Sequence, residues 1–235
     1  MNKLSALIIF SLCALVATAA EVADYRLEVE DFDQLKVTDG VNIVYTCSED
    51  SAGWVCFSCT PELADRLLFT NNKSQLHIQV DLQEEIITDL PTLHVYSRGL
   101  TKVENSSDST IIIEKNCPVQ SLKIRQIGNG MIIFNDIQAG SVEATISTGK
   151  GHLVLNGNAG RVKLSNVGTG PIEAGNLVAR NVKVIMLGTG GIDCHANESI
   201  SVYGAGSGKV YYAGNPEKVT NRSLGVKSIA VDSSR

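Results

Sequence analysis

Gly149-Lys150-Gly151-His152-Leu153-Val154-Leu155 and Gly168-Thr169-Gly170-Pro171-Ile172-Glu173-Ala174 are two copies of one pattern. In each copy a Gly-x-Gly corner comes first, and apolar residues then occupy every second position of a short run. The corner occurs five times, at intervals of 21, 19, 20 and 18 residues, with its glycines at Gly128, Gly130, Gly149, Gly151, Gly168, Gly170, Gly188, Gly190, Gly206 and Gly208. A period near 20 residues with one permissive corner per repeat predicts a solenoid, in which each repeat stacks on its neighbours.

Two alternating runs per repeat predict two strands per coil. The first run follows the corner directly and places these apolar residues on one side: Ile132/Phe134, Leu153/Leu155, Ile172/Ala174, Ile192/Cys194 and Val210/Tyr212. The second run begins 10 to 12 residues after the corner, with Val142/Ala144/Ile146, Val162/Leu164, Val182/Val184 and Ile200/Val202. Alternation at period two indicates a strand with one buried face. We therefore predict an all-β, parallel β-solenoid with coils of about 20 residues over residues 105–232.

Less regular repeats flank the clear ones, as expected for coils that cap a solenoid. Ser107-Asp108-Ser109 lies one period upstream, and Gly225-Val226-Lys227 lies one period downstream, with Ile229 and Val231 expected to point inward. The corner glycines are assigned a structural role, because a strand-to-strand corner needs positive φ or room for a neighbouring backbone. A phosphate-binding glycine loop is excluded, since such a loop opens a helix and strands follow every corner here.

The first residues have the features of a secretory signal. A basic residue, Lys3, precedes an apolar run that ends in small residues before Glu21. We therefore expect a signal peptide at residues 1–20, one domain at residues 21–235 and no transmembrane span. The mature chain is expected in the periplasm, at the outer-membrane surface or in the medium. Upstream of the repeats, strands are expected within residues 24–103, with one or two helical turns at 61–69 and a turn at Asn71-Asn72.

Composition restricts the partners. The net charge is −5 and basic residues are not clustered along the chain, so nucleic acid is not expected as a partner. Aromatic residues make up only 5% of the chain, which argues against a sugar-binding platform built of Trp and Tyr. The four histidines are scattered without metal-ligand spacing, so neither a metal site nor a cofactor is expected.

Five cysteines follow the predicted signal peptide. An exported protein permits disulfides, so Cys47 is expected to pair with Cys56 or Cys59 across a hairpin turned at residues 48–53. Cys194 falls in the inward column of the first run and is expected to stay reduced and buried. Cys117 precedes a proline at a coil corner and is the expected exposed thiol.

Outward-facing positions supply the candidate site residues. Glu173 and Asp193 are expected on neighbouring coils about one strand spacing apart, and paired carboxylates of this kind can perform acid/base chemistry. The simpler interpretation, which we prefer, is two solvated charges on a polar face. The outward column of the second strand contains Lys123, Glu143, Lys163, Lys183 and Ser201, and its mixed signs are interpreted as an ordinary solvated ladder.

Three groups of residues resemble one known family, the GIN domain, labelled as an auto-transporter adhesin head and common in Bacteroidetes. These are the opening segment of residues 31–45, the Gly-x-Gly coils and the closing Tyr211-Tyr212-Ala213-Gly214-Asn215-Pro216. The resemblance implies an exported β-solenoid with an adhesin-like role and no catalytic residues. We therefore expect a non-enzymatic interaction module that binds a cell-surface glycan or protein. The alternative is a polysaccharide-active enzyme or carbohydrate-binding protein that uses Glu173 and Asp193. The oligomeric state is left open.

Overall fold

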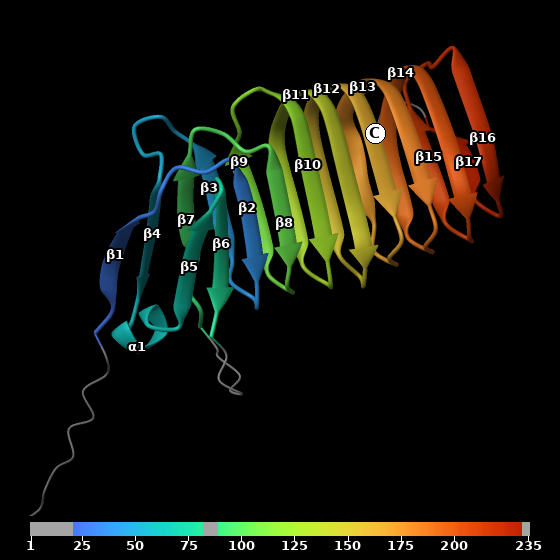
Figure 1. Ribbon diagram of the computed structural model, residues 1–235. Coiled ribbons are helices and arrows are strands. Elements are labelled where there is room, and N and C mark those ends of the chain that lie inside the picture. Colours follow the sequence, from blue (N-terminus) through green and yellow to red (C-terminus); the bar gives the residue numbers. More distant parts are fainter. Residues whose placement is uncertain (1–20, 82–88, 232–235) are drawn as a thin grey trace, which may run out of the picture.

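The computed structural model describes residues 21–81 and 89–231. The predicted signal peptide, residues 1–20, lies outside the described residues. The described chain is nearly all β and forms a β-solenoid of about 6 turns with coils of roughly 20 residues, as the repeats predict (Figure 1). No helix in these two ranges is both long enough and apolar enough to span a membrane.

The solenoid has two long faces, which we call face A and face B. Face A is built from the strands that follow the corners: β1 (Ala23–Glu28), β4 (Trp54–Cys59), β7 (Leu93–Ser97), β3 (Ile43–Cys47), β9 (Thr110–Lys115), β15 (Lys209–Ala213) and β17 (Lys227–Ala230). Face B is built from the strands that precede the corners: β5 (Leu67–Asn72), β6 (Gln75–Val80), β2 (Gln34–Thr38), β8 (Lys102–Ser106), β10 (Val119–Ile127) and β16 (Lys218–Leu224). Four longer strands bend from face A into face B: β11 (Met131–Thr148), β12 (His152–Asn166), β13 (Ile172–Met186) and β14 (Gly191–Ala205).

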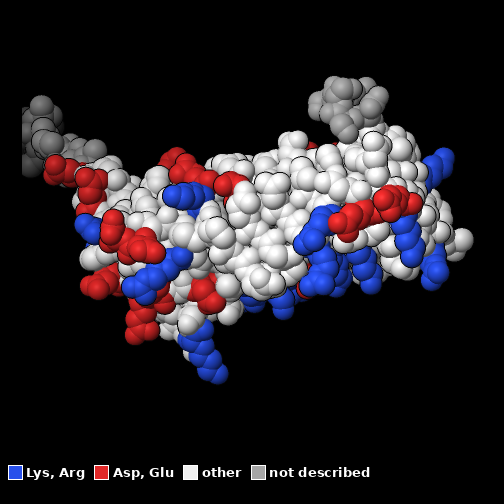
Figure 2. All heavy atoms as spheres, turned by 90° about the horizontal axis from the view of Figure 1, so that it is seen from above, with Lys and Arg blue, Asp and Glu red and all other residues white. Residues whose placement is uncertain are grey.

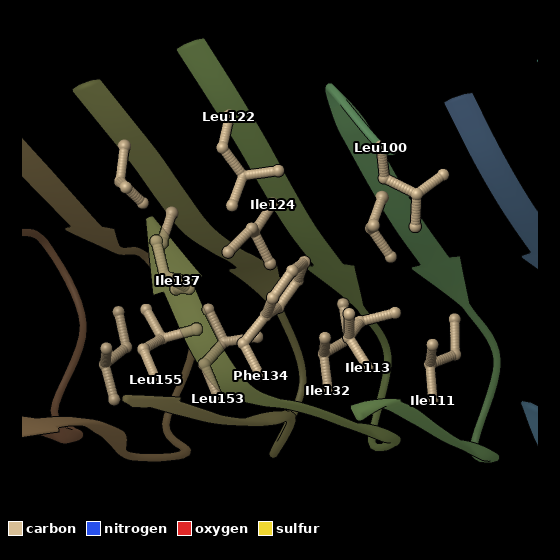
Figure 3. Packing of buried hydrophobic residues seen from close by; sticks show 14 of the residues in the cluster. Leu100, Ile111, Ile113, Leu122, Ile124, Ile132, Phe134, Ile137, Leu153 and Leu155 are labelled. Atoms are coloured by element: carbon tan, nitrogen blue, oxygen red, sulfur yellow. The ribbon is translucent and has the colours of Figure 1, made fainter. Parts of the chain in front are cut away.

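Stacked apolar columns fill the space between the two faces. Leu122 and Ile124 of β10 point inward from face B, and the side chains of β9, β11 and β12 meet them from face A (Figure 3). Parallel in-register pairing repeats each column from coil to coil, as in Ile132 opposite Leu153 and Phe134 opposite Leu155. Each coil therefore covers the apolar edge of the next, and the core is continuous along the stack.

The corner glycines are needed because successive coils approach closely. Gly149 has φ 81°, a region that L side chains rarely adopt. Gly170 has ordinary φ, but a Cβ there would collide with the carbonyl oxygen of Gly151 and lie 2.6 Å from that of Lys150. The corners are therefore stacked backbone on backbone, and a side chain would push the coils apart.

Three buried amides close the turns beside these corners: Asn105, Gln126 and Asn166. Asn105 Nδ2 donates to the carbonyl of Ser109 at 2.8 Å, and Asn166 Nδ2 donates to that of Gly170 at 2.8 Å. The apolar columns of the repeats do not reveal these polar residues. An amide at the inward position just before a corner was the available signal.

The last coil corrects the predicted inward residues. Lys209 pairs with Lys227 and Tyr211 pairs with Ile229, so Ile229 lies in an outward column. Ile229 is 36% exposed and Val231 is 40% exposed. The corner is displaced by one residue from the expected Gly225-Val226-Lys227, and a shift of one residue moves every side chain of a strand to the other face.

The upstream part of the chain is interleaved with itself. Strand β2 pairs in parallel with β6 on one side and with β8 on the other, and β3 lies in the same way between β7 and β9 (Figure 1). The coil made of β2 and β3 therefore lies between two coils that come later in the sequence. A short helix, α1 (Pro61–Ala64), precedes β5. The turn expected at Asn71-Asn72 is wrong, because both residues belong to β5 and the turn lies at Lys73-Ser74.

This interleaving also corrects the predicted disulfide. Strand β7 separates β3 from β4, so residues 48–53 do not close a hairpin and Cys47 does not pair with Cys56 or Cys59. Cys47 instead bonds to Cys117, with a Cα–Cα distance of 5.9 Å. Both lie at the same end of the adjacent strands β3 and β9, so the expected exposed thiol at Cys117 is wrong as well. Cys56, Cys59 and Cys194 are free, and Cys194 is buried as predicted.

Candidate binding face

Face B carries a row of lysines on consecutive coils. The in-register residues of this outward column are Lys102, Lys123, Glu143, Lys163 and Lys183. Adjacent strands lie about 4.8 Å apart, so four cations and one carboxylate occupy five successive rungs. We call this column the lysine ladder. The structure confirms the predicted column from Lys123 to Lys183 and adds Lys102 at its upstream end. Positions some 20 residues apart in the sequence are neighbours in a solenoid, so these basic residues cluster in space.

A shallow groove runs beside the ladder. It has a volume of about 430 Å³ and crosses the strands of several coils. Its polar lining comes from the ladder and from the columns on either side, with Ser121, Ser141, Glu143, Arg161, Lys163, Asn181, Lys183, Ser199, Ser201 and Tyr203. Glu143 is the one acidic residue of this lining, against three cations. The groove therefore has an excess of positive charge and many hydroxyl and amide groups.

The carboxylate in the ladder is bound by its neighbours. Lys163 Nζ lies 2.6 Å from Glu143 Oε1. A hydrogen bond from Lys163, together with the charges of Lys163 and Lys123, lowers the pKa of Glu143 against the opposing effect of burial. Glu143 is thus ionised at neutral pH and offsets one lysine charge.

Glu143 also lies opposite Lys123, but two pairs in the column place lysine opposite lysine. Lys102 pairs in register with Lys123, and Lys163 pairs with Lys183. Like charges directly opposite one another on neighbouring strands are destabilising. Lys183 Nζ lies 5.2 Å from the centre of the Tyr203 ring, which gives it a cation–π contact.

A second charge cluster lies at the upstream end of the lysine ladder and is structural. Glu104 is 8% exposed and is surrounded by Lys36, Lys102 and Arg125 at 3.7, 3.6 and 3.9 Å. These residues come from three adjacent strands, β2, β8 and β10. The cluster joins the interleaved coil to the regular stack, and its carboxylate is surrounded by partners from this chain.

Charge is divided unequally along the molecule. Residues 21–101 contain 5 Lys and Arg against 15 Asp and Glu, whereas residues 102–231 contain 13 Lys and Arg against 9 Asp and Glu. Acidic side chains gather at the end that begins the chain, and basic side chains line one side of the regular coils (Figure 2). The net charge of −5 therefore conceals a basic face on an acidic molecule.

The structure brings the predicted carboxylates together on face A. Glu173 and Asp193 are in-register partners on β13 and β14. Partial desolvation by neighbouring atoms, and then the charge of Glu173, raise the pKa of Asp193. His152 Nε2 lies 2.9 Å from Glu173 Oε1, so Glu173 already has a partner.

The surroundings of this pair differ from those of an active-site cleft. Its neighbours in the same column are Val154 on one side and Tyr211 on the other. Both carboxylates are exposed, and neither lines the groove on face B. Neither lines the hollows at residues 31–33 and 98–99, at residues 24–26 and 56–58, or at residues 138–139 and 158–160. Within the described ranges no group of three or more His, Cys, Asp or Glu is placed to hold a metal ion.

Comparison with known proteins gives one family and several similar folds. The family model described as "Putative auto-transporter adhesin, head GIN domain" matches residues 31–216. A crystal structure from Bacteroides fragilis, described as a putative adhesin, has a TM-score of 0.81 at 21% identity and covers 91% of this chain and 98% of its own. One from Parabacteroides distasonis, described as a putative lipid binding protein, has a TM-score of 0.70 at 18% identity, covering 88% and 96%. A third, a putative adhesin from Parabacteroides merdae, has a TM-score of 0.68 at 17% identity, covering 89% and 96%. At these identities the structures share the fold alone. No curated protein matches the chain.

Proposed function

This chain belongs to the family of the putative auto-transporter adhesin head GIN domain, and we propose that it is an exported, non-enzymatic interaction module that holds a surface partner on face B. The observation that carries the proposal is the groove of about 430 Å³ across face B. It is lined by charged, hydroxyl and amide groups on a rigid stack of strands. Long regular faces of this kind are the binding surfaces of repeat proteins.

The fold suits binding over a long surface. Each rung of face B repeats at the strand spacing of about 4.8 Å, so a partner that extends along the stack meets similar groups on every coil. The strands are hydrogen-bonded to both neighbours, and the core beneath them is continuous. The groove is therefore formed before binding, and little conformational entropy is lost when a partner occupies it.

Two experiments test the proposal. The purified protein is applied to arrays of host glycans, matrix proteins and bacterial envelope polysaccharides, and its location is followed in fractionated cells. We expect export and binding to at least one class of surface molecule. Retention in the cytoplasm, or binding to none of these classes, would contradict the proposed role.

A second function has one observation in its favour. Asp193 and Glu173 are in-register partners on neighbouring strands, and desolvation and the charge of Glu173 raise the pKa of Asp193, as suits a general acid. A polysaccharide-cleaving enzyme would use Asp193 as the acid and Glu173 as the base. Release of reducing ends from a polysaccharide by the wild type, and its loss in Asp193→Asn and Glu173→Gln, would support this function. If the wild type and both variants release equal amounts of reducing ends, this function is excluded.

A further inference from the structure

We propose that the partner of face B is an acidic polysaccharide, whose carboxylate or sulfate groups lie along the lysine ladder. This inference rests on the proposed function, since it names the partner of the same face. It uses the register of the ladder, the composition of the groove and the unequal distribution of charge.

The register provides a periodic array of cations. Lys102 and Lys123 occupy two successive rungs, and Lys163 and Lys183 occupy two more after Glu143. A sugar residue in an extended polysaccharide has a length similar to the strand spacing of about 4.8 Å. A polymer with an acidic group at regular intervals can therefore contact several lysines without bending.

The flanking columns supply groups that suit sugars. Ser121, Ser141 and Ser199 lie on one side of the ladder, with Arg161 and Asn181 between them. Hydroxyl and amide side chains donate and accept hydrogen bonds, as sugar hydroxyls do. On the other side Tyr203 offers an aromatic ring within the groove. Arg161 adds a planar guanidinium, which binds carboxylate with two parallel hydrogen bonds.

Binding would also relieve a cost within the fold. The pairs Lys102/Lys123 and Lys163/Lys183 place like charges opposite each other. Glu104 contacts Lys102 and Glu143 bonds to Lys163, so these two carboxylates offset part of the repulsion. An anionic chain over the ladder would reduce this repulsion. Face A has a smaller in-register pair of the same kind, Lys209 and Lys227, away from the groove. It provides a matched control.

Nucleic acid and membrane fit this face less well. A flat face of parallel strands offers no helix or two-stranded ribbon to enter a DNA groove. Single-stranded binding uses several aromatic platforms, and Tyr203 is the one aromatic residue that lines the groove. Val142, Val162 and Val182 also line the groove, but all three are buried beneath the charged and polar columns, so these apolar side chains do not protrude to enter a lipid layer.

Binding to polygalacturonate, dextran sulfate, neutral dextran and duplex DNA tests the inference. The double variant Lys163→Gln/Lys183→Gln is compared with Lys209→Gln/Lys227→Gln, which removes the same charge from face A. Circular dichroism and thermal melting verify that both variants fold. We expect binding to one or both acidic glycans and none to dextran. The first variant should weaken binding about tenfold, from two surface charge contacts of ordinary strength. It should also reduce the slope of log K against log salt concentration by up to about two.

The outcomes separate this inference from the proposed function. Binding to carboxylated but not sulfated glycan, or the reverse, identifies the acidic group and supports the inference. Equal weakening by both variants would show attraction to net charge alone and overturn it. Tighter binding to DNA than to either acidic glycan would also overturn it. If the protein binds a neutral surface glycan and Lys163→Gln/Lys183→Gln does not change that binding, the acidic polysaccharide is ruled out. The proposed role as an interaction module would remain supported.

Discussion

Removal of the Cys47–Cys117 disulfide should destabilise the protein by several kcal/mol. The bond closes a loop of 70 residues. In the chain-entropy model such a loop restricts the unfolded state by about 4.4 kcal/mol at 25 °C. A domain of this size loses about 2–4 °C of melting temperature per kcal/mol, so the melting point should fall by roughly 9 to 18 °C.

The assay uses the double variant Cys47→Ser/Cys117→Ser. Urea unfolding gives the change in free energy, and intact mass after thiol blocking verifies that the wild type has one disulfide. Hydrogen exchange should locate the loss in β3 and β9, because these neighbouring strands carry the two cysteines. The matched control is Cys56→Ser, which changes a free, half-buried cysteine and should alter stability by less than about 0.5 kcal/mol.

Two results would refute this reasoning. If the double variant is as stable as a wild type proven to contain the disulfide, the loop must already be restricted in the unfolded chain without the bond. Thiol blocking of Cys47 and Cys117 in the native protein would show that the bond does not form.

Three further predictions concern single positions. In urea unfolding, Gly170→Ala should destabilise the fold by about 3 kcal/mol, at the upper end for overpacking, because the new Cβ would collide with the carbonyl of the preceding coil. The control Gly191→Ala should be neutral or slightly stabilising, because no atom lies within 4 Å of the position its Cβ would take. In Glu173→Gln the pKa of Asp193, followed by NMR titration, should fall toward its usual value, since partial desolvation and the Glu173 charge raise it. A carboxyl group with a raised folded pKa contributes stability below its unfolded pKa, and this contribution is lost as pH rises through the folded pKa. The dependence of the unfolding free energy on pH should therefore be smaller in the variant. An unchanged titration of Asp193 would disprove its coupling to Glu173. Cys194, whose pKa burial and the Asp193 charge raise to about 12, should resist iodoacetamide in the folded protein and react in urea; rapid labelling of the native thiol would contradict its burial.

The regular coils could be predicted because their signals are local and repeat. Glycine at a fixed interval and alternation at period two place Leu155 and Leu164 in the core, and both are fully buried. The interleaved part could not be predicted in this way. Whether β2 pairs with the strand that follows it or with β6 and β8 depends on contacts far apart in the sequence. The disulfide depended on that topology, so its predicted partner was wrong.

The candidate face was likewise predictable only in part. Register between coils was sufficient to place Glu173 beside Asp193 and to align Lys163 with Lys183. The column from Lys123 to Lys183 was also predicted, and only its upstream member Lys102 was missed, because Lys102 belongs to a coil without a Gly-x-Gly corner. The groove also depends on how the side chains of Arg161 and Tyr203 rise beside the ladder, which alternation does not determine.

The interleaved coil has a consequence for mechanical load. A solenoid pulled at its end can peel one rung at a time, since each terminal strand has a single neighbour. Force applied at the start of this chain detaches β1 from β4 and then reaches β2, which is hydrogen-bonded along both edges. To detach, strand β2 must break its hydrogen bonds to β6 and β8 at the same time, whereas a terminal strand breaks those to one neighbour. The bond from Cys47 to Cys117 then passes tension from β3 directly to the end of β9. The chain would thus resist extension most strongly at the coil that is first in sequence and internal in space.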